Sequence, residues 1–329
     1  MMRHTITAAM AALALVAAPA AANDSVASMQ AGGLVLETTD GVTMLSEDLY
    51  LSASEVRVTY QFLNHTSEGI ETIVAFPMPD IEPGYIGDTG GVLDEPERIL
   101  PFITWVNGRS VHTEVEKKAV VDGVDVTARL EALGVPLNPY GQATLDALQA
   151  LPEPVLAAME AEGVVSRGPV DGENRWANPQ WTLKTTHYWT EYFPPGEEVE
   201  IRHIYAPAVG GSAISIVGNP QAGWALADEG YDGQYCLDQN VIDAARRGWA
   251  SGLHYSETWL DYVLVTGANW SGPIRDFRLV VDKGSTDNLV SFCAEGVTRI
   301  SPTQFEVRRS NYTPTRDLNV LILNGARYD

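Results

Sequence analysis

The stretch EVRVTYQFLNHTSEGIETIVAFPMPD, residues 55–80, decides the fold class of this chain. Apolar and polar side chains alternate along its first half, which is typical of a half-buried β-strand. The apolar positions are Val56, Val58, Tyr60 and Phe62. A polar turn at 64–69 leads to a second β-rich run at 70–76, which Pro77 and Pro79 end because proline cannot donate to a sheet ladder. The stretch predicts a β-hairpin with one face buried.

A second hairpin is predicted around Asn107-Gly108, which separates two alternating runs between residues 102 and 116. A type I′ turn needs positive φ at both central positions, and Asn and Gly tolerate positive φ. We therefore expect Val106 to pair with Arg109.

Residues 181–208 repeat the pattern, with two strands on either side of a Pro-Pro-Gly turn at 194–196. This arrangement predicts a third hairpin. One register of the two strands brings His187 near His203. Two imidazoles could supply half of a tetrahedral zinc site, but no third ligand has metal spacing nearby. We favour a hydrogen-bonded histidine pair in an aromatic core, and no cofactor is indicated.

The sequence changes character between residues 125 and 165, where apolar residues recur at helical spacing and Gly134 and Gly163 fall where helices end. Short helices are stable only when packed, so we expect a small helical insertion lying on a sheet. Strands separated by turns continue to the C-terminus, and residues from about 255 to 329 form a predicted C-terminal β lobe. The predicted fold is mainly β, with antiparallel, sandwich-like sheets.

Residues 1–22 have the features of a secretory signal peptide: Arg3 near the start, an apolar run at 8–18, and small residues at Ala20 and Ala22. We expect cleavage after Ala22, which leaves 23–329 as a single β-rich region in the periplasm or secreted. A buried N-terminal helix is disfavoured, because it would not need the small-residue exit. No later segment is apolar enough to predict an integral membrane span.

The charge excludes one class of partner. Loss of Arg3 with the signal peptide leaves 20 basic residues against 43 acidic ones, a net charge of −23. Nucleic acid is therefore not expected, because a phosphate backbone needs basic patches and the longest basic runs here are pairs.

Cys236 and Cys293 are the only cysteines, and an even number in an exported chain predicts one disulfide. A catalytic cysteine is the alternative, but neither residue lies in a nucleophile motif with an identifiable histidine partner. A short helix is predicted after Cys236, with Asp238 as its cap and Gly248 as its end. The disulfide would fix that helix to the last sheet.

Several strings carry a resemblance to a known family. They are NDSVASMQAGGLVL, MLSEDLYLSASEVRVTYQFLN, VAFPMPD, DVTARLEALGVPL, FPPGEEVEIRHIYAPAVGGS, YVLVTGANWSGPIRDFRLVVDKG and LVSFCAEG. Over nearly the whole mature chain the sequence resembles the exported bacterial family named domain of unknown function 4424. The resemblance implies an exported bacterial protein and supplies no catalytic residue. The strand, Asn, strand and FPMP order also resembles the opening of the vault and inter-alpha-trypsin type β-sandwich domain.

Aromatic side chains next to carboxylates suggest a binding surface on the 181–208 strands and the loops around Cys236, since such groups suit glycan stacking. Its candidate residues are Trp181, Trp189, Glu191, Asp228 and Asp232. Ordinary core packing is the alternative for the tryptophans, because large aromatics are mostly buried in sandwich folds. A calcium loop at 228–239 is disfavoured, because its third and twelfth positions lack acidic oxygen.

No hydrolase, zinc-protease or nucleotide-binding motif is present. We therefore expect a non-catalytic envelope protein that binds an unknown envelope protein or glycan. The alternative is an unrecognised hydrolase of envelope polymers. An enzyme should show a concave pocket with converging polar groups of perturbed pKa, whereas a binding module can show only a surface patch.

Overall fold

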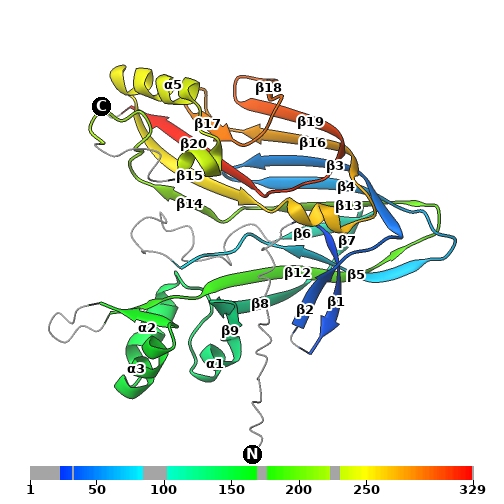
Figure 1. Ribbon diagram of the computed structural model, residues 1–329, viewed down its shortest axis with the longest axis horizontal. Helices are drawn as coiled ribbons and strands as arrows, with labels where there is room; N and C mark the ends of the chain where they lie inside the picture. Colours follow the sequence, from blue (N-terminus) through cyan, green and yellow to red (C-terminus); the bar gives the residue numbers. More distant parts are fainter. Residues whose placement is uncertain (1–22, 32, 84–101, 169–175, 223–229, 328–329) are drawn as a thin grey trace, which may run out of the picture.

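The computed structural model describes residues 23–31, 33–83, 102–168, 176–222 and 230–327 (Figure 1). They form a mainly β fold with layered, largely antiparallel sheets and a small helical insertion, which confirms the predicted fold class.

The largest sheet has eight strands. They are β3 (Val42–Ser52), β4 (Val56–Asn64), β6 (Ile103–Val106), β7 (Arg109–Val111), β13 (Glu198–Tyr205), β16 (Ile274–Asp282), β18 (Thr298–Arg299) and β19 (Gln304–Tyr312). Their order is β18-β19-β16-β3-β4-β13-β6-β7. Only the β16 and β3 pair is parallel among these strands, so the N-terminal and C-terminal parts of the chain meet in the middle of this sheet.

Two further sheets pack with it. The six-stranded sheet contains β1 (Ser25–Gln30), β2 (Gly33–Glu37), β5 (Ile70–Pro77), β8 (Glu114–Val121), β9 (Val124–Asp125) and β12 (Thr182–Phe193), in the order β2-β1-β5-β12-β8-β9. The four-stranded sheet contains β14 (Val209–Ser212), β15 (His254–Tyr262), β17 (Leu289–Phe292) and β20 (Leu318–Ala326), in the order β14-β15-β20-β17. A separate pair joins β10 (Val165–Arg167) to β11 (Ala177–Pro179).

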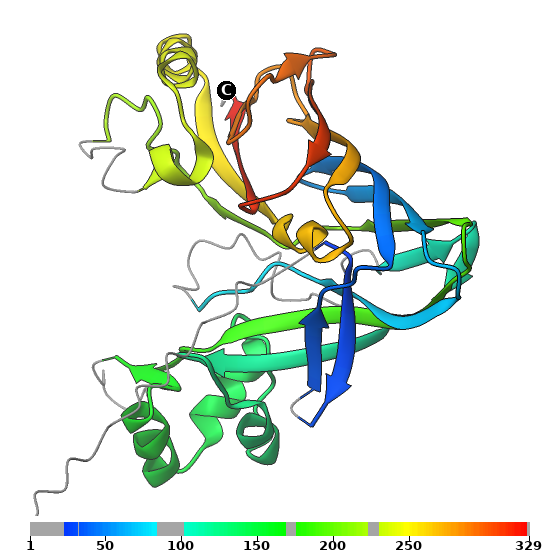
Figure 2. The ribbon, with the colours of Figure 1, turned by 45° about the vertical axis from the view of Figure 1, so that its right-hand side comes forward.

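The helices lie in two groups (Figures 1 and 2). In the range predicted for the insertion are α1 (Thr127–Ala132), α2 (Gln142–Ala150) and α3 (Glu153–Ala161), beside the six-stranded sheet. The second group, α4 (Tyr231–Tyr235) and α5 (Gln239–Ala250), covers the four-stranded sheet. Asp238 caps α5, as predicted, by accepting a hydrogen bond from the backbone N–H of Val241 at 2.9 Å. A 3₁₀ turn, η4 (Val265–Asn269), follows β15.

The hairpin predicted for residues 55–80 does not form, so that prediction is wrong. Its two strands form, with the buried face as expected, since Val58 and Tyr60 are both fully buried. However, β4 pairs with β3 and β13, whereas β5 pairs with β1 and β12 in the other sheet. The turn at 64–69 therefore connects two layers. Strand alternation decides which face is buried, but it does not decide which strand is the hydrogen-bonding neighbour.

The 181–208 hairpin is wrong for the same reason, because β12 belongs to the six-stranded sheet and β13 to the eight-stranded one. By contrast, the Asn107-Gly108 hairpin is confirmed. Its two residues have φ of 48° and 75°, and Val106 pairs with Arg109. Positive φ at both central residues reverses the chain tightly, so β6 and β7 stay paired within one sheet.

One apolar cluster joins all three large sheets, with members such as Val58 of β4, Phe76 of β5 and Tyr262 of β15. A second cluster packs α1–α3 against β8 and Trp181, and a third packs α4 and α5 against β15 and β20. On β20, Val320 and Ile322 belong to the first cluster, whereas Leu321 and Leu323 belong to the third. The four-stranded sheet is therefore covered on both faces, but the eight-stranded sheet keeps a polar outer face.

Candidate functional site

The polar outer face of the eight-stranded sheet holds a groove of about 490 Å³, called here the arginine groove. Its lining residues are Asp48, Tyr50, Arg57, Thr59, Arg202, Ile204, Arg278, Val280 and Gln304. They come from β3, β4, β13, β16 and β19, and they gather because successive side chains of a strand point to opposite faces. A second hollow of about 270 Å³ shares Asp48 and Arg278 with the groove and extends to Arg308.

The sheet register sets the spacing of the three groove arginines. Arg202 on β13 lies opposite Thr59 on β4, and Thr59 lies opposite Asp48 on β3. Asp48 lies opposite Arg278 on β16. Arg57 is displaced by two residues along β4 from Thr59, so it is the diagonal neighbour of Arg202. Diagonal neighbours on one sheet face have Cβ atoms roughly 7 to 8 Å apart, within reach of long side chains.

Aromatic rings hold two of these arginines in place. The Arg57 guanidinium carbon lies 4.3 Å from the centre of the Tyr50 ring, and the Arg202 guanidinium carbon lies 4.3 Å from the Trp105 ring. Cation–π stacking leaves the N–H edges of a guanidinium free to donate. Such a seated guanidinium loses less conformational entropy when it binds a carboxylate.

The three guanidiniums differ in their ionic partners. Arg278 donates to Asp48 at 2.9 Å and to Glu306 at 2.7 Å, and this hydrogen bonding holds the pKa of Glu306 below its usual range. Arg57 lies 3.1 Å from a carboxylate oxygen of Glu55. Across the part of the chain that the structure describes, no carboxylate lies within ion-pair distance of Arg202. The groove thus presents the Arg202 guanidinium, which is stacked on Trp105, beside the Arg57 guanidinium, which is also paired with Glu55.

The two histidines considered as metal ligands lie in facing sheets and contact the same ring. Phe102 stacks on His187 with ring centres 4.1 Å apart and on His203 with ring centres 4.9 Å apart. The nitrogens of His203 lie 3.0 Å from the Thr104 hydroxyl and 3.1 Å from a carboxylate oxygen of Asp24. Among the described residues, no three histidine, cysteine or acidic side chains are grouped to hold a metal ion.

Thr104, His203 and Asp24 form a hydroxyl–imidazole–carboxylate relay of the kind that hydrolases use. All three residues are fully buried, however, so a substrate cannot reach the hydroxyl. Burial raises the pKa of Asp24, even though His203 opposes that shift. Burial also raises the pKa of the neighbouring Glu47 to about 8. Neither carboxyl lines the arginine groove.

The residues predicted to form an aromatic binding surface do not gather on one surface. Trp181 is fully buried among the insertion helices, where its N–H donates to the Leu137 carbonyl at 2.8 Å. Trp189 is buried in the main core and donates to Glu191 at 3.1 Å. Asp232 is exposed on α4, and Asp228 lies outside the described residues. A surface made by the two tryptophans is wrong, because both rings pack between layers.

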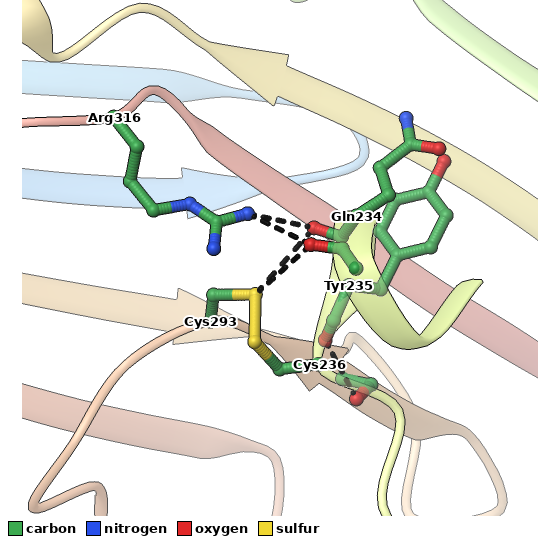
Figure 3. Close-up of a disulfide and its surroundings, with 7 residues drawn as sticks. Gln234, Tyr235, Cys236, Cys293 and Arg316 are labelled. Carbon is green, nitrogen blue, oxygen red and sulfur yellow. Dashed lines mark hydrogen bonds between the residues drawn. A yellow bond between two sulfur atoms is a disulfide. The ribbon is translucent and has the colours of Figure 1, made fainter. Parts of the chain in front are cut away.

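Cys236 and Cys293 form the predicted disulfide, with a sulfur–sulfur distance of 2.09 Å (Figure 3). Cys236 directly follows α4, and Cys293 directly follows β17. Beside the bond, Arg316 donates to the backbone carbonyls of Gly233 and Gln234 at 3.1 and 3.3 Å. The disulfide and this arginine together fix the short α4 to the four-stranded sheet.

The arginine groove was not predicted from the sequence, although the sequence contains a local indication of it. Arg57 and Arg202 both lie on the polar side of alternating strands. Nothing local indicates that β4 and β13 are neighbours, or that Arg278 comes next to them through the parallel β16 and β3 pair.

Fold and site together define a mainly β protein of layered sheets with an arginine groove on an open sheet face and a buried polar cluster within. The sequence matches the family described as domain of unknown function (DUF4424) over residues 22–321, so the chain belongs to that family. No curated protein matches it. Within the described residues, no helix has the length and apolar character needed to cross a membrane.

The solved structures that are similar to this chain at low identity include the following two. A "putative nutrient binding protein" from Legionella pneumophila matches at 13% identity and a TM-score of 0.43, over 92% of this chain and 70% of that chain. An M1 zinc metallopeptidase from Deinococcus radiodurans matches at 10% identity and a TM-score of 0.26, over 87% of this chain and 43% of that chain. This chain therefore spans less than half the length of the peptidase.

Proposed function

We propose that this protein is a non-catalytic binding protein of the cell envelope, and that its arginine groove holds an acidic segment of a protein partner. One observation carries the proposal. In a chain with a net charge of −22, Arg57 and Arg202 are presented together on an open sheet face, each seated on an aromatic ring. Preorganised guanidiniums favour bidentate pairing with carboxylates.

The composition of the groove favours a protein partner over a glycan or a small molecule. Arginine, tyrosine and tryptophan are enriched at the centres of protein interfaces, whereas small-molecule sites are concave and mostly apolar. Glycan stacking would need free aromatic faces. The Tyr50 and Trp105 faces are already covered by guanidiniums.

The chemistry of the groove also favours binding over hydrolysis. Glycoside hydrolysis needs two carboxyl groups across the scissile bond. Asp48 is the one carboxylate among the lining residues, and Arg278 already engages it. The relay of Thr104, His203 and Asp24 is enclosed in the core.

An envelope location, in the periplasm or secreted after cleavage behind Ala22, agrees with the disulfide, because such bonds persist in oxidising compartments. Attraction between surface charges is screened by salt, so partner binding should weaken as ionic strength rises.

The test compares two variants that each remove two positive charges. Arg57→Ala with Arg202→Ala empties the groove of its seated cations. Arg246→Ala with Arg247→Ala is the matched control on the exposed face of α5. We expect a labelled poly-glutamate peptide to bind the wild type and the control equally at low salt, and the groove variant about tenfold or more weakly by fluorescence anisotropy.

Periplasmic extract passed over the same three proteins supplies the natural ligand. A protein retained by the wild type and the control, but not by the groove variant, supports the proposal. Equal retention by all three proteins, or groove-dependent recovery of a glycan instead, contradicts it. Retention of nothing by the wild type, together with equal peptide binding by both variants, also contradicts it.

A further inference from the structure

The first residues that the structure describes lie in the core. Asn23, Asp24 and Ser25 are each fully buried. The Asn23 backbone nitrogen donates to the Thr266 hydroxyl at 2.9 Å, and that hydroxyl donates to the Asn23 carbonyl at 2.8 Å. The residue is thus anchored to η4, which lies beside β1 (Figure 2).

The Asn23 side chain extends toward the eight-stranded sheet. Its amide nitrogen donates to one carboxylate oxygen of Glu47 at 3.1 Å. Glu47 is 1% exposed and lies on β3. Next to it, Asp24 is paired with His203. The cluster therefore holds two buried carboxyl groups and a single imidazole.

Two oxygen atoms in this cluster lack a partner. They are the side-chain oxygen of Asn23 and the second carboxylate oxygen of Glu47. An unpaired buried acceptor destabilises the folded state, so such atoms are rare in native proteins. Both belong to residues that contact each other. The pair of unpaired oxygens points to donors that an internal peptide N–H at residue 23 does not supply.

We propose that cleavage of the peptide bond between Ala22 and Asn23 completes this cluster, because the new α-ammonium of Asn23 forms a buried ion pair with Glu47. A signal peptidase adds water across the bond, Ala22 leaves with the carboxylate, and the Asn23 amine takes up a proton. Its single N–H becomes three. One stays on Thr266, and two become available for the two unpaired oxygens.

The electrostatics of the Glu47 carboxyl also favour an ammonium group at residue 23. With an uncharged amide at residue 23, burial is the largest cause that raises the pKa of Glu47, and Asp24 adds to it. A cation beside the carboxyl lowers that pKa and keeps the group ionised at neutral pH. After cleavage, the ion pair with Glu47 would hold the start of β1 in the core in addition to the hydrogen bonds of the sheet. The mature chain is therefore more stable than its precursor.

The test uses two forms of the protein: the mature chain that starts at Asn23, and the same chain with one alanine before Asn23. Glu47→Gln is made in both, and Glu68→Gln, at an exposed glutamate, is the control. We expect Glu47→Gln to lower the folding equilibrium constant by about tenfold or more in the mature chain only, because it breaks a buried ion pair there. Urea unfolding measures the constant.

An equal loss in both forms would overturn the proposal, and so would N-terminal sequencing of the native protein that finds a residue other than Asn23. If the extended form does not fold, the mature protein alone still decides. The pH dependence of its reaction with an amine reagent should give the α-amino group of Asn23 a pKa above the usual value of about 8. Glu47→Gln should return that pKa to the usual value. An ordinary pKa in the wild type rejects the ion pair. These measurements follow folding, so they can fail independently of the arginine groove.

Discussion

Asn64 is fully buried where two connections between the layers meet, the one after β4 and the one after β12. Its side-chain nitrogen donates to the Phe193 carbonyl at 2.9 Å and to the Glu68 carbonyl at 2.8 Å. Its side-chain oxygen accepts from the backbone N–H and the hydroxyl of Thr66. Gly196 donates to its backbone carbonyl at 2.8 Å. One side chain therefore ties the turn after β4 to the turn after β12, which replaces the two hairpins expected from the sequence.

His187 gives the molecule a predicted sensitivity to acid. Burial lowers its pKa from the usual 6.5 to about 4, and His203 and Lys117 act in the same direction. The unfolded chain therefore takes up the proton first. Above about pH 6.5 the free energy of unfolding does not depend on the protonation of His187. As the pH falls from about 6.5 toward 4, that free energy decreases by up to roughly 3 kcal/mol.

Urea unfolding of the wild type at pH 7 and pH 5 should show part of this loss, about 2 kcal/mol from His187. His187→Phe keeps an aromatic ring against Phe102 and should reduce the difference between the two pH values. His112→Gln changes an exposed histidine and should leave it as in the wild type. An unchanged pH dependence in His187→Phe would mean that His187 does not carry the effect.

At the scale of the element, α5 shows how packing overrides a local signal. The sequence places the helix end at Gly248, but the helix continues to Ala250, so that prediction is wrong. Gly248 serves another purpose. A Cβ at this position would lie 2.7 Å from the ring carbon Cζ of Tyr255, on β15. The glycine lets α5 approach the four-stranded sheet closely.

Gly248→Ala should therefore destabilise the protein by about 1 to 3 kcal/mol, because overpacking against Tyr255 exceeds the helix propensity gain of roughly 1 kcal/mol. Gly233→Ala is the matched control, since a Cβ there meets no atom of the described residues within 4 Å. Thermal and urea unfolding of both variants compare them. A Gly248→Ala protein more stable than the wild type would show that the Tyr255 ring can move aside.

At the scale of the whole molecule, the disulfide links residues 57 positions apart and holds α4 on the sheet. In the chain-entropy model, closing a loop of this length stabilises the fold by about 4 kcal/mol. Cys236→Ser with Cys293→Ser should lose about that free energy of unfolding in urea.

A reducing agent should destabilise the wild type and leave the double serine variant unchanged. If the oxidised wild type and the variant unfold at the same urea concentration, the disulfide contributes no stability. The main core joins all three large sheets without the disulfide, so we expect the variant still to fold.

The sequence by itself determined the features that depend on near neighbours. Alternation gave the buried face of β4, the Asn-Gly turn gave the register of β6 with β7, and helical spacing gave the insertion. The cysteine count gave the disulfide, and the strings in order gave the family. Each of these signals is complete within a short segment or in the composition, so no distant partner is needed to interpret it.

Only the tertiary structure decided which strands are neighbours and what their faces assemble. Backbone hydrogen-bonding groups are alike in every strand, so β4 carries no local mark that favours β13 over β5. The arginine groove depends on that choice, because Arg57, Arg202 and Arg278 meet only in the eight-stranded order. The cluster of Asn23, Glu47 and Thr266 depends on it too, since more than 200 residues of chain separate Asn23 from Thr266.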